Sequence, residues 1–220
     1  MRICVLTEGS PSTTKKIPDC DLLVVGFQGL GEVDYESELK GKTEKFECIA
    51  RLSKGLDCAV ICGCKTNSRG LIRKSLATFD KGKLVAISDM NCVMDKEEFK
   101  SGAGLGLFTL GGYKVGLLVE NDLFFPENFA SLTACGCNLV VCALETATDS
   151  MPATLVRAYS YAYGVPSITC AGKVAYFADV TGEMATSFQG VNVFEHSPKN
   201  EYHLITQRRR GIFCRQVDDY

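Results

Sequence analysis

The chain has 220 residues, of which 46% are hydrophobic and 23% are charged, and these ordinary values predict one globular domain over residues 1–220. The formal net charge of −2 gives no reason to expect nucleic acid or an anionic membrane as a partner. The apolar stretch near the N-terminus, ICVLT, is too short for a signal peptide, and no apolar run has the length of a membrane span. We therefore expect a cytoplasmic protein.

The 12 cysteines are expected to be reduced, because disulfide frameworks belong mainly to small secreted domains. Several lie inside apolar segments, where a thiol acts as a small buried hydrophobic group. Neither close pair of cysteines has the Cys-x-x-Cys spacing, and the chain has only two histidines. Free thiols are therefore favoured over a structural zinc site, and we expect no metal and no cofactor.

In the first half of the chain, short apolar segments predict strands at residues 2–7, 21–26 and 57–63. A polar stretch with two prolines, SPSTTKKIP, predicts a loop between the first two strands. Residues 30–40 are polar and acidic, which indicates a loop with a helical turn. Thr43 is a candidate cap for a helix that runs to Lys54 and ends at Gly55.

A hairpin follows, because the turn sequence Asp80-Lys81-Gly82 separates apolar segments at 71–80 and 83–88. The glycine-rich run at 101–106 does not connect a strand to a helix, so a loop that enters a strand is favoured over a phosphate-binding turn.

The centre of the chain predicts a strand, a sharp turn, a helix and a second strand. Residues 113–119 and 138–144 are apolar runs typical of buried strands, and Pro126 suits the first turn of the intervening helix. The polar triplet Glu120-Asn121-Asp122 follows the first strand directly. Open α/β sheets bind ligands at such carboxyl ends of strands. Further on, the residues around Pro152 predict another helix, and 165–171 another strand.

The most specific motif is GLLVEND at 116–122, followed by Phe-Pro-Glu at 125–127. It resembles the Gly-Val-Leu-Ile-Cys-Tyr-Asp and Phe-Pro-Glu motif of the nitrilase superfamily, the carbon–nitrogen hydrolases. DLLVVGFQ at 21–28 and DVTGE at 179–183 also resemble segments of that family. The resemblance extends over nearly the whole chain. It implies an α/β fold, a four-layer α-β-β-α sandwich, and a homodimer.

The same resemblance places substitutions at all three catalytic positions. The family's nucleophilic cysteine falls on Glu120, its general-base glutamate on Phe27, and its lysine on Met90 or, with a shift of one residue, on Asp89. That chemistry needs a thiolate, a proton-transferring carboxylate and an oxyanion-stabilising cation, which act as a unit. The sequence therefore predicts a hydrolase-like protein, a pseudoenzyme, that has lost amide and nitrile hydrolysis.

The alternative is an active carbon–nitrogen hydrolase with relocated catalytic residues. Cys64, Cys92 and Cys142 are its candidate thiols, because they lie near strand ends or near the lost lysine position.

A family-like sheet implies that Asp89, Asn121 and Glu145 lie near Glu120. One interpretation is a pocket of carboxylates that binds a small molecule, such as an amine, or a hard cation. The other is a closed site in which Glu120 pairs with a lysine, an arginine or the backbone of the turn. We favour the second interpretation, because clustered carboxylates are often structural.

Overall fold

The computed structural model describes residues 1–11, 14, 16–94, 98–110 and 112–197. The arginine run at 208–210 and the C-terminal segment that resembles the nitrilase family lie outside the described residues.

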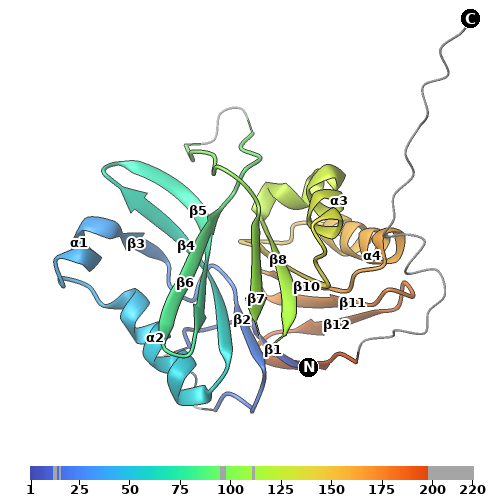
Figure 1. Cartoon of the computed structure of the whole chain (residues 1–220), viewed down its shortest axis with the longest axis horizontal. Coiled ribbons are helices and arrows are strands. Elements are labelled where there is room, and N and C mark those ends of the chain that lie inside the picture. Colours follow the sequence, from blue (N-terminus) through green and yellow to red (C-terminus); the bar gives the residue numbers. More distant parts are fainter. Residues whose placement is uncertain (12–13, 15, 95–97, 111, 198–220) are drawn as a thin grey trace, which may run out of the picture.

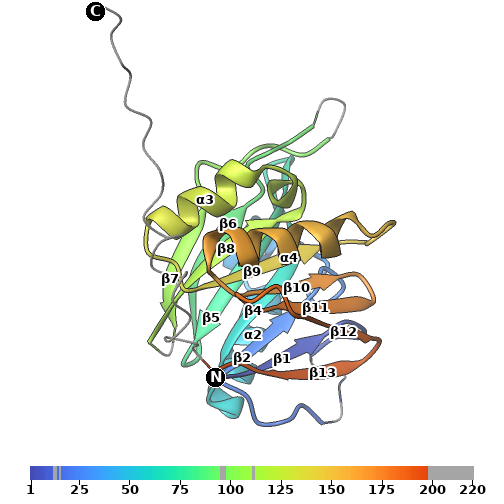
Figure 2. The ribbon, with the colours of Figure 1, turned by 90° about the vertical axis from the view of Figure 1, so that its right-hand side faces the viewer.

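Two β-sheets pack face to face, with helices on the outer side of each (Figure 1). Helices α1 (Tyr35–Leu39) and α2 (Lys45–Leu56) lie outside the first sheet. Helices α3 (Pro126–Ala134) and α4 (Met151–Tyr163) lie side by side outside the second sheet (Figure 2). The molecule is therefore the predicted four-layer α-β-β-α sandwich.

The first sheet has the order β13-β1-β2-β4-β5-β6, and β3 pairs with one end of β4. Its strands β1, β2 and β4 are parallel, whereas β4, β5 and β6 form antiparallel hairpins. The bounds of the strands are β1 (Arg2–Leu6), β2 (Leu22–Val25), β3 (Glu32–Asp34), β4 (Ala59–Ser68), β5 (Leu71–Asp80), β6 (Lys83–Asp89) and β13 (Val191–Glu195).

The second sheet has the order β12-β11-β10-β9-β8-β7, with β8, β9 and β10 parallel. A 3-10 helix, η1 (Glu120–Phe124), directly follows β8 and leads to α3. The bounds of the strands are β7 (Gly106–Leu110), β8 (Tyr113–Val119), β9 (Leu139–Leu144), β10 (Ser167–Ala171), β11 (Val174–Ala178) and β12 (Met184–Phe188).

The core has an inner layer between the sheets and an outer layer beneath each pair of helices. Strand β8 contributes to two of these layers, because successive side chains of a strand point to opposite faces. Leu117 and Val119 pack between the sheets, whereas Leu118 packs under α3 against Phe129 and Leu132. This burial on both faces explains why β8 is a continuous apolar run rather than an alternating one.

Several predicted boundaries in the first half differ from the structure. Helix α2 begins at Lys45 rather than next to Thr43, and it continues through Gly55 to Leu56. It stops there because Asp57 adopts a left-handed conformation with φ 50°, and its N–H bonds back to the carbonyl of Lys54. Strand β4 extends past residue 63 to Ser68 because β5 pairs with it to its end. The short strand β3 lies within the predicted loop at 30–40.

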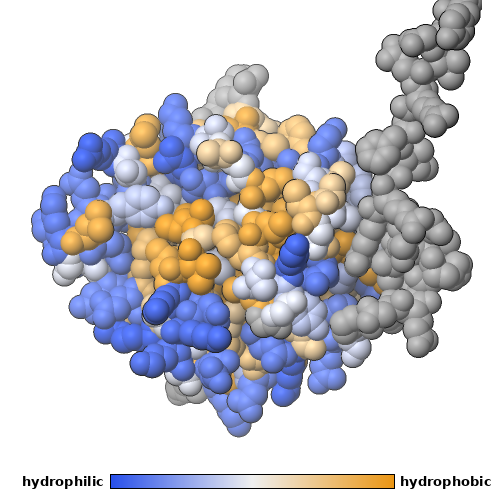
Figure 3. Space-filling model, viewed as in Figure 1, coloured by the Kyte–Doolittle hydropathy of each residue, from blue (hydrophilic) through white to orange (hydrophobic). Residues whose placement is uncertain are grey.

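The space-filling view shows hydrophilic residues over α1 and α2 and an apolar patch near the centre of the same face (Figure 3). Leu84 and Val85 of the edge strand β6 are among the exposed apolar residues. Helix α2 is amphipathic in the expected way, since it buries Ile49 against the sheet and turns charged residues to water. Among the described residues, no helix is long and apolar enough to cross a membrane.

Candidate functional site

The chain turns sharply where β8 ends, and Glu120 is the first residue of the turn. Glu120 is buried and adopts a left-handed backbone conformation with φ 50°. A residue other than glycine rarely adopts this conformation, and such local strain persists only where surrounding contacts hold it. The elbow is therefore a position at which the neighbouring structure must fix the backbone.

Asp122 provides one part of that support. Its carboxylate is fully buried and accepts hydrogen bonds from the backbone N–H groups of Asn91 at 2.9 Å, Cys92 at 2.8 Å and Val119 at 3.3 Å. Burial raises the pKa of Asp122, although these N–H donors oppose the rise. Asp122 thus ties the segment after β6 to the turn after β8, which joins the edge of one sheet to the elbow of the other.

The carboxylate of Glu120 has two partners inside the protein. Its Oε1 accepts a 2.6 Å hydrogen bond from the N–H of Glu145, just after β9, and lies 3.2 Å from Lys74 Nζ on β5. The side chains of Lys74 and Glu120 are only 13% and 10% exposed, so this is a buried ion pair. Breaking such a pair from one side leaves an uncompensated buried charge, which is strongly unfavourable.

A second glutamate extends this ion pair toward the surface. Glu145 Oε2 lies 3.2 Å from Lys74 Nζ, and Glu145 Oε1 lies 2.7 Å from Lys65 Nζ. Lys65 and Lys74 are directly opposite each other in the β4–β5 hairpin, where like charges repel. Glu145 offsets the repulsion by presenting one oxygen to each ammonium group. We call Lys65, Glu145, Lys74 and Glu120 the elbow network.

An aromatic ring covers the two lysines of the elbow network. The ring centroid of Phe99 lies 5.0 Å from Lys74 Nζ and 5.9 Å from Lys65 Nζ. A cation is attracted to the face of an aromatic ring at such distances. Phe99 therefore stabilises the two ammonium groups.

The pKa values of the two glutamates in the elbow network are shifted in opposite directions. Burial raises the pKa of Glu120, and the nearby Lys74 only partly offsets it. At Glu145 burial acts in the same sense, but the hydrogen bonds from Lys65 and Lys74 outweigh it and lower the pKa. At Lys74 burial is outweighed by Glu120 and Glu145, so the pKa is raised and the ammonium group stays charged.

These shifts predict a pH titration in which Glu120 loses its proton at a higher pH than Glu145 does. A carboxyl group whose pKa is raised by folding makes the protein less stable as the pH rises from its ordinary pKa to its folded-state pKa. A carboxyl group whose pKa is lowered by folding adds stability, which is lost as the pH falls through its folded-state pKa. Carboxyl carbon NMR of the protein, assigned with Glu120→Gln and Glu145→Gln, measures both midpoints. Equal midpoints, or the reverse order, contradict the burial of Glu120.

A cavity of about 690 Å³ lies beside Glu145, where β1, β2, β9 and β10 end. Glu8 and Lys173 form an ion pair of 3.6 Å in its wall, and Gln28 Nε2 donates a 2.5 Å hydrogen bond to the carbonyl of Thr7. The carboxyl ends of parallel strands are the usual ligand position of open α/β sheets. We call this space the strand-end cavity.

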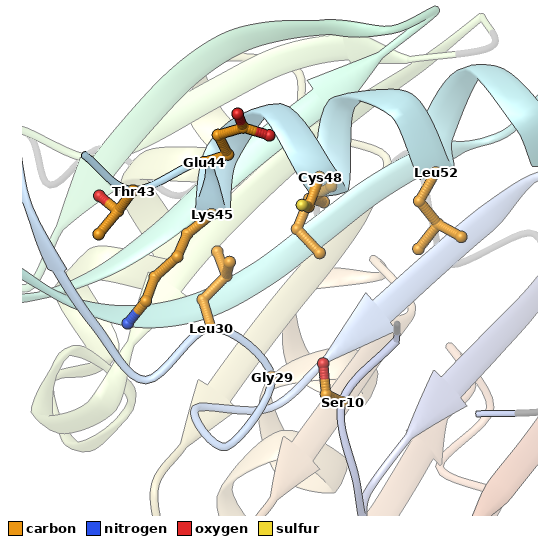
Figure 4. A pocket seen from close by; sticks show the side chains of 9 residues that line it. Ser10, Gly29, Leu30, Thr43, Glu44, Lys45, Cys48 and Leu52 are labelled. Atoms are coloured by element: carbon orange, nitrogen blue, oxygen red, sulfur yellow. The ribbon is translucent and has the colours of Figure 1, made fainter. Parts of the chain in front are cut away.

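Another cavity, of about 580 Å³, lies between the start of α2 and the loop after β2 (Figure 4). Leu30, Lys45 and Leu52 are among the residues around it. It shares no lining residue with the elbow network. The strand-end cavity, which includes Glu145, is therefore the better candidate for a site that works with the elbow.

No protein-family model matches the sequence, and no curated protein matches it. Solved structures do match. A cysteine-to-alanine variant of an amidase from the nitrilase superfamily, from Nesterenkonia AN1, superposes with a TM-score of 0.73 and 17% identity over 96% of this chain and 94% of that chain. This chain has the nitrilase-superfamily fold.

Two further structures of the same amidase contain an amide or a group derived from one. One variant carries the acetamide moiety of fluoroacetamide on its active-site cysteine, with a TM-score of 0.70 and 16% identity over 88% of each chain. Another variant is in complex with butyramide, with a TM-score of 0.69 and 16% identity over 88% of each chain.

On this nitrilase fold, the positions that the sequence resemblance assigns to the base and the lysine are apolar and buried. Phe27 packs in the inner core, close to β4, and a Cβ at Gly63 would meet the Phe27 nitrogen at 2.9 Å. Met90 is also buried in the inner core, and its N–H donates a 2.8 Å hydrogen bond to the carbonyl of Lys74. The cation near the elbow therefore comes from the strand beside the expected position.

The structure brings only two of the four predicted pocket residues into direct contact with each other. Glu120 and Glu145 are in direct contact through the hydrogen bond described above. Asp89 accepts a 2.7 Å hydrogen bond from Ser75 Oγ and lies 3.6 Å from Arg73 Nε, so its described partners belong to β5. Asn121 follows Glu120 in η1 and is half-buried.

Sequence reasoning missed Lys65 and Lys74. One signal for them exists in the sequence: Gly70 marks a turn after the segment that contains Lys65, and the structure places Arg69 and Gly70, both with positive φ, in the turn between β4 and β5. Counting outward from that turn places the two lysines opposite each other. A pair of lysines in that register needs an anionic partner.

The three thiols that a relocated active site could use are poorly suited to nucleophilic attack. Cys64 and Cys142 are completely buried, and burial raises the pKa of Cys64 to about 12 and that of Cys142 well above its usual range. Cys92 is half-buried and accepts a 3.3 Å hydrogen bond from Asn128, and burial raises its pKa as well. The attacking species is the thiolate, which a raised pKa disfavours.

Proposed function

We propose that this protein uses the nitrilase fold without amide or nitrile hydrolysis, and that it binds a small molecule or a partner instead. The observation that carries the proposal is the state of Glu120, at the position that the sequence resemblance assigns to the nucleophile. Its carboxylate is paired with Lys74 and accepts the N–H of Glu145. A carboxylate held in this way is a weak nucleophile, and its attack on an amide would form an anhydride rather than a thioester.

The alternative function, hydrolysis by relocated residues, needs a thiolate close to a carboxylate and a lysine. Cys64 interacts electrostatically with Asp89 and Lys45, but it is completely buried and its raised pKa keeps it protonated at neutral pH. Neither Cys92 nor Cys142 has a described contact with a lysine. The geometry therefore favours loss of the reaction.

The strand-end cavity is the proposed ligand site. Its wall carries the Glu8–Lys173 ion pair, the amide of Gln28 and the carboxylate of Glu145. The wall is otherwise largely apolar, so the cavity suits a small molecule with an apolar body and a polar end, since small-molecule sites orient their ligands with a few polar groups. Such a ligand would contact the outer end of the elbow network through Glu145.

We also propose that the protein is a cytoplasmic homodimer. Helix α4, which follows the elbow, exposes Met151 and Tyr161 by 52% and 45%, and exposed apolar residues on one helix suit a subunit contact. All cysteines in the described part of the chain are free thiols, which suits a reducing compartment.

The proposal predicts no hydrolysis of simple amides or nitriles. The protein is incubated with butyramide and with an aliphatic nitrile, and ammonia release is measured against the buffer and against an active nitrilase-superfamily amidase. We expect release at the buffer rate, because the thiolate, base and oxyanion-stabilising cation act together and the sequence resemblance places substitutions at all three positions. Turnover that disappears in Cys64→Ala, Cys92→Ala or Cys142→Ala would instead establish a relocated nucleophile.

A further inference from the structure

The cavity beside the start of α2 has no role in the proposed function, and it shares no lining residue with the strand-end cavity. We call it the α2 cavity. Its volume of about 580 Å³ lies within the range of small-molecule sites, which is about 300–1,000 Å³. Most of its wall is apolar: Leu30 and Ile49 belong to the core under α2, and Leu52 packs against that core. An apolar ligand in this cavity would extend the core and lose its contact with water, which is favourable.

The α2 cavity exists because helices cover the outer faces of the two sheets unequally. Helices α3 and α4 pack side by side on the second sheet, whereas α2 is the only described helix of more than five residues on the first sheet. Between β1 and β2, the described residues form no helix. Ser10 of this connection and Leu30 of the loop after β2 face α2 across a hollow (Figure 4).

Two charged side chains line the α2 cavity, but only one of them extends along it. Glu44 points away from the cavity (Figure 4), and its carboxylate forms an ion pair of 3.0 Å with Arg51. Lys45 is half-buried and extends along the cavity from the first turn of α2. Its Nζ donates a hydrogen bond to the backbone carbonyl of Glu32, which is a neutral acceptor. Among the described residues, no carboxylate forms an ion pair with Lys45.

The position of Lys45 in α2 makes this charge informative. Lys45 is the first residue of the helix, where a positive charge is unfavourable next to the helix dipole. The nearby carboxylate of Glu38 is held by the backbone, because it accepts the N–H groups of Lys45 at 3.0 Å and of Phe46 at 3.1 Å. Glu38 attracts the ammonium group of Lys45 only from beyond ion-pair distance. An anion bound at Nζ would therefore stabilise a charge that the protein itself compensates incompletely.

The charge and the apolar surface are separated along the α2 cavity. Figure 4 shows Lys45 at one end and Leu52 at the other, with Leu30 and Cys48 between them. A complementary ligand has an anionic group at one end and an apolar body. We propose that the α2 cavity binds a free medium-chain carboxylic acid, with its carboxylate at Lys45 Nζ and its hydrocarbon chain against Leu30 and Leu52. The ammonium group donates a charge-assisted hydrogen bond, and each buried methylene group of the chain adds to the affinity.

Cys48 allows a direct test, because it lines the α2 cavity and is exposed. The full-length reduced protein is labelled with N-ethylmaleimide, with and without decanoate below its micellar concentration, and peptide mass spectrometry follows the labelling with time. Cys135, which is exposed at the end of α3 on the other sheet, is the internal reference. We expect decanoate to slow the labelling of Cys48 alone. Equal slowing at both cysteines, or at neither, would overturn the proposal.

Calorimetric titration with decanoate separates recognition of the charge from apolar binding. Lys45→Met should weaken binding about tenfold, because a hydrogen bond to a charged group contributes on this scale. Lys42→Met is the matched control, since it removes the same charge from an exposed side chain outside the cavity, and it should leave the affinity unchanged. Decylammonium has a similar chain and the opposite charge, and should bind at least about tenfold more weakly than decanoate. Undiminished binding of decanoate to Lys45→Met would contradict the proposal.

Vesicles of anionic phospholipid distinguish a free acid from a lipid surface. We expect them to leave the labelling of Cys48 unchanged, and protection by vesicles but not by decanoate would contradict the proposal. Circular dichroism establishes that the variants are folded. The result is independent of the proposed function, because Lys45 and Cys48 belong neither to the elbow network nor to the strand-end cavity.

Discussion

Replacement of Lys74 by methionine is expected to lower the free energy of unfolding by about 3 kcal/mol, because removing one partner of a buried ion pair costs about 3–5 kcal/mol. Lys74 is the only member of the elbow network that contacts both glutamates. Methionine keeps most of the length and apolar volume of lysine, so the effect reports the charge. Without Lys74, the Glu120 carboxylate stays buried with only the Glu145 N–H as its partner.

Urea unfolding at pH 7 measures the change, and a double variant separates charge from packing. Lys74→Met combined with Glu120→Gln removes both charges and should recover most of the loss. Glu120→Gln alone should lower the free energy of unfolding by less than Lys74→Met does, since Lys74 keeps Glu145 as its ion-pair partner. Lys65→Met is the matched control and should cost about 1 kcal/mol or less, because its ion pair is over a third exposed.

The pH dependence of the stability of Lys74→Met gives an independent measure of the burial of Glu120. Loss of the ammonium group raises the pKa of Glu120 further above its ordinary value. Protonation of Glu120 then removes the buried charge, so the stability deficit should shrink as the pH falls toward the folded-state pKa of Glu120 and grow as the pH rises. A deficit that does not change between pH 5 and pH 8 would show that Glu120 is solvated rather than buried.

Asp122→Ala is expected to lower the free energy of unfolding by about 3 kcal/mol, because a buried donor left without a partner costs about 1–3 kcal/mol. The carboxylate of Asp122 accepts the N–H groups of Asn91, Cys92 and Val119. Alanine leaves all three without this acceptor and opens a cavity beneath the elbow. The loss should be largest around the segment after β6, which the carboxylate holds.

Asp122→Asn is the matched control, since it keeps the size of the side chain and one carbonyl acceptor. We expect it to recover at least half of the loss, with the amide oxygen taking the place of Oδ1, which bonds Asn91 and Cys92. Urea midpoints at constant slope give the free energies. Hydrogen exchange of the amides of Asn91, Cys92 and Val119 reports the local effect. Normal protection of these amides in Asp122→Ala would show that other groups hold the elbow.

The sequence by itself determined much of the framework. The apolar runs at β8 and β9 could be predicted because both strands are buried on both faces. The β5–β6 hairpin could be predicted because Lys81 and Gly82 of its turn adopt positive φ, which the Asp-Lys-Gly turn allows. The end of α2 could not, because Asp57 rather than Gly55 adopts the left-handed conformation that stops the helix.

The sequence also determined the chemical character of the candidate site, since it places the carboxylate of Glu120 where the family resemblance places a thiol. Only the tertiary structure decided the state of that carboxylate. Lys74 is remote from Glu120 in the sequence, and the register of β4 and β5 and the packing of the two sheets bring it to the elbow. The charge of a buried group depends on its burial and on the charges around it, and residues on other strands supply both.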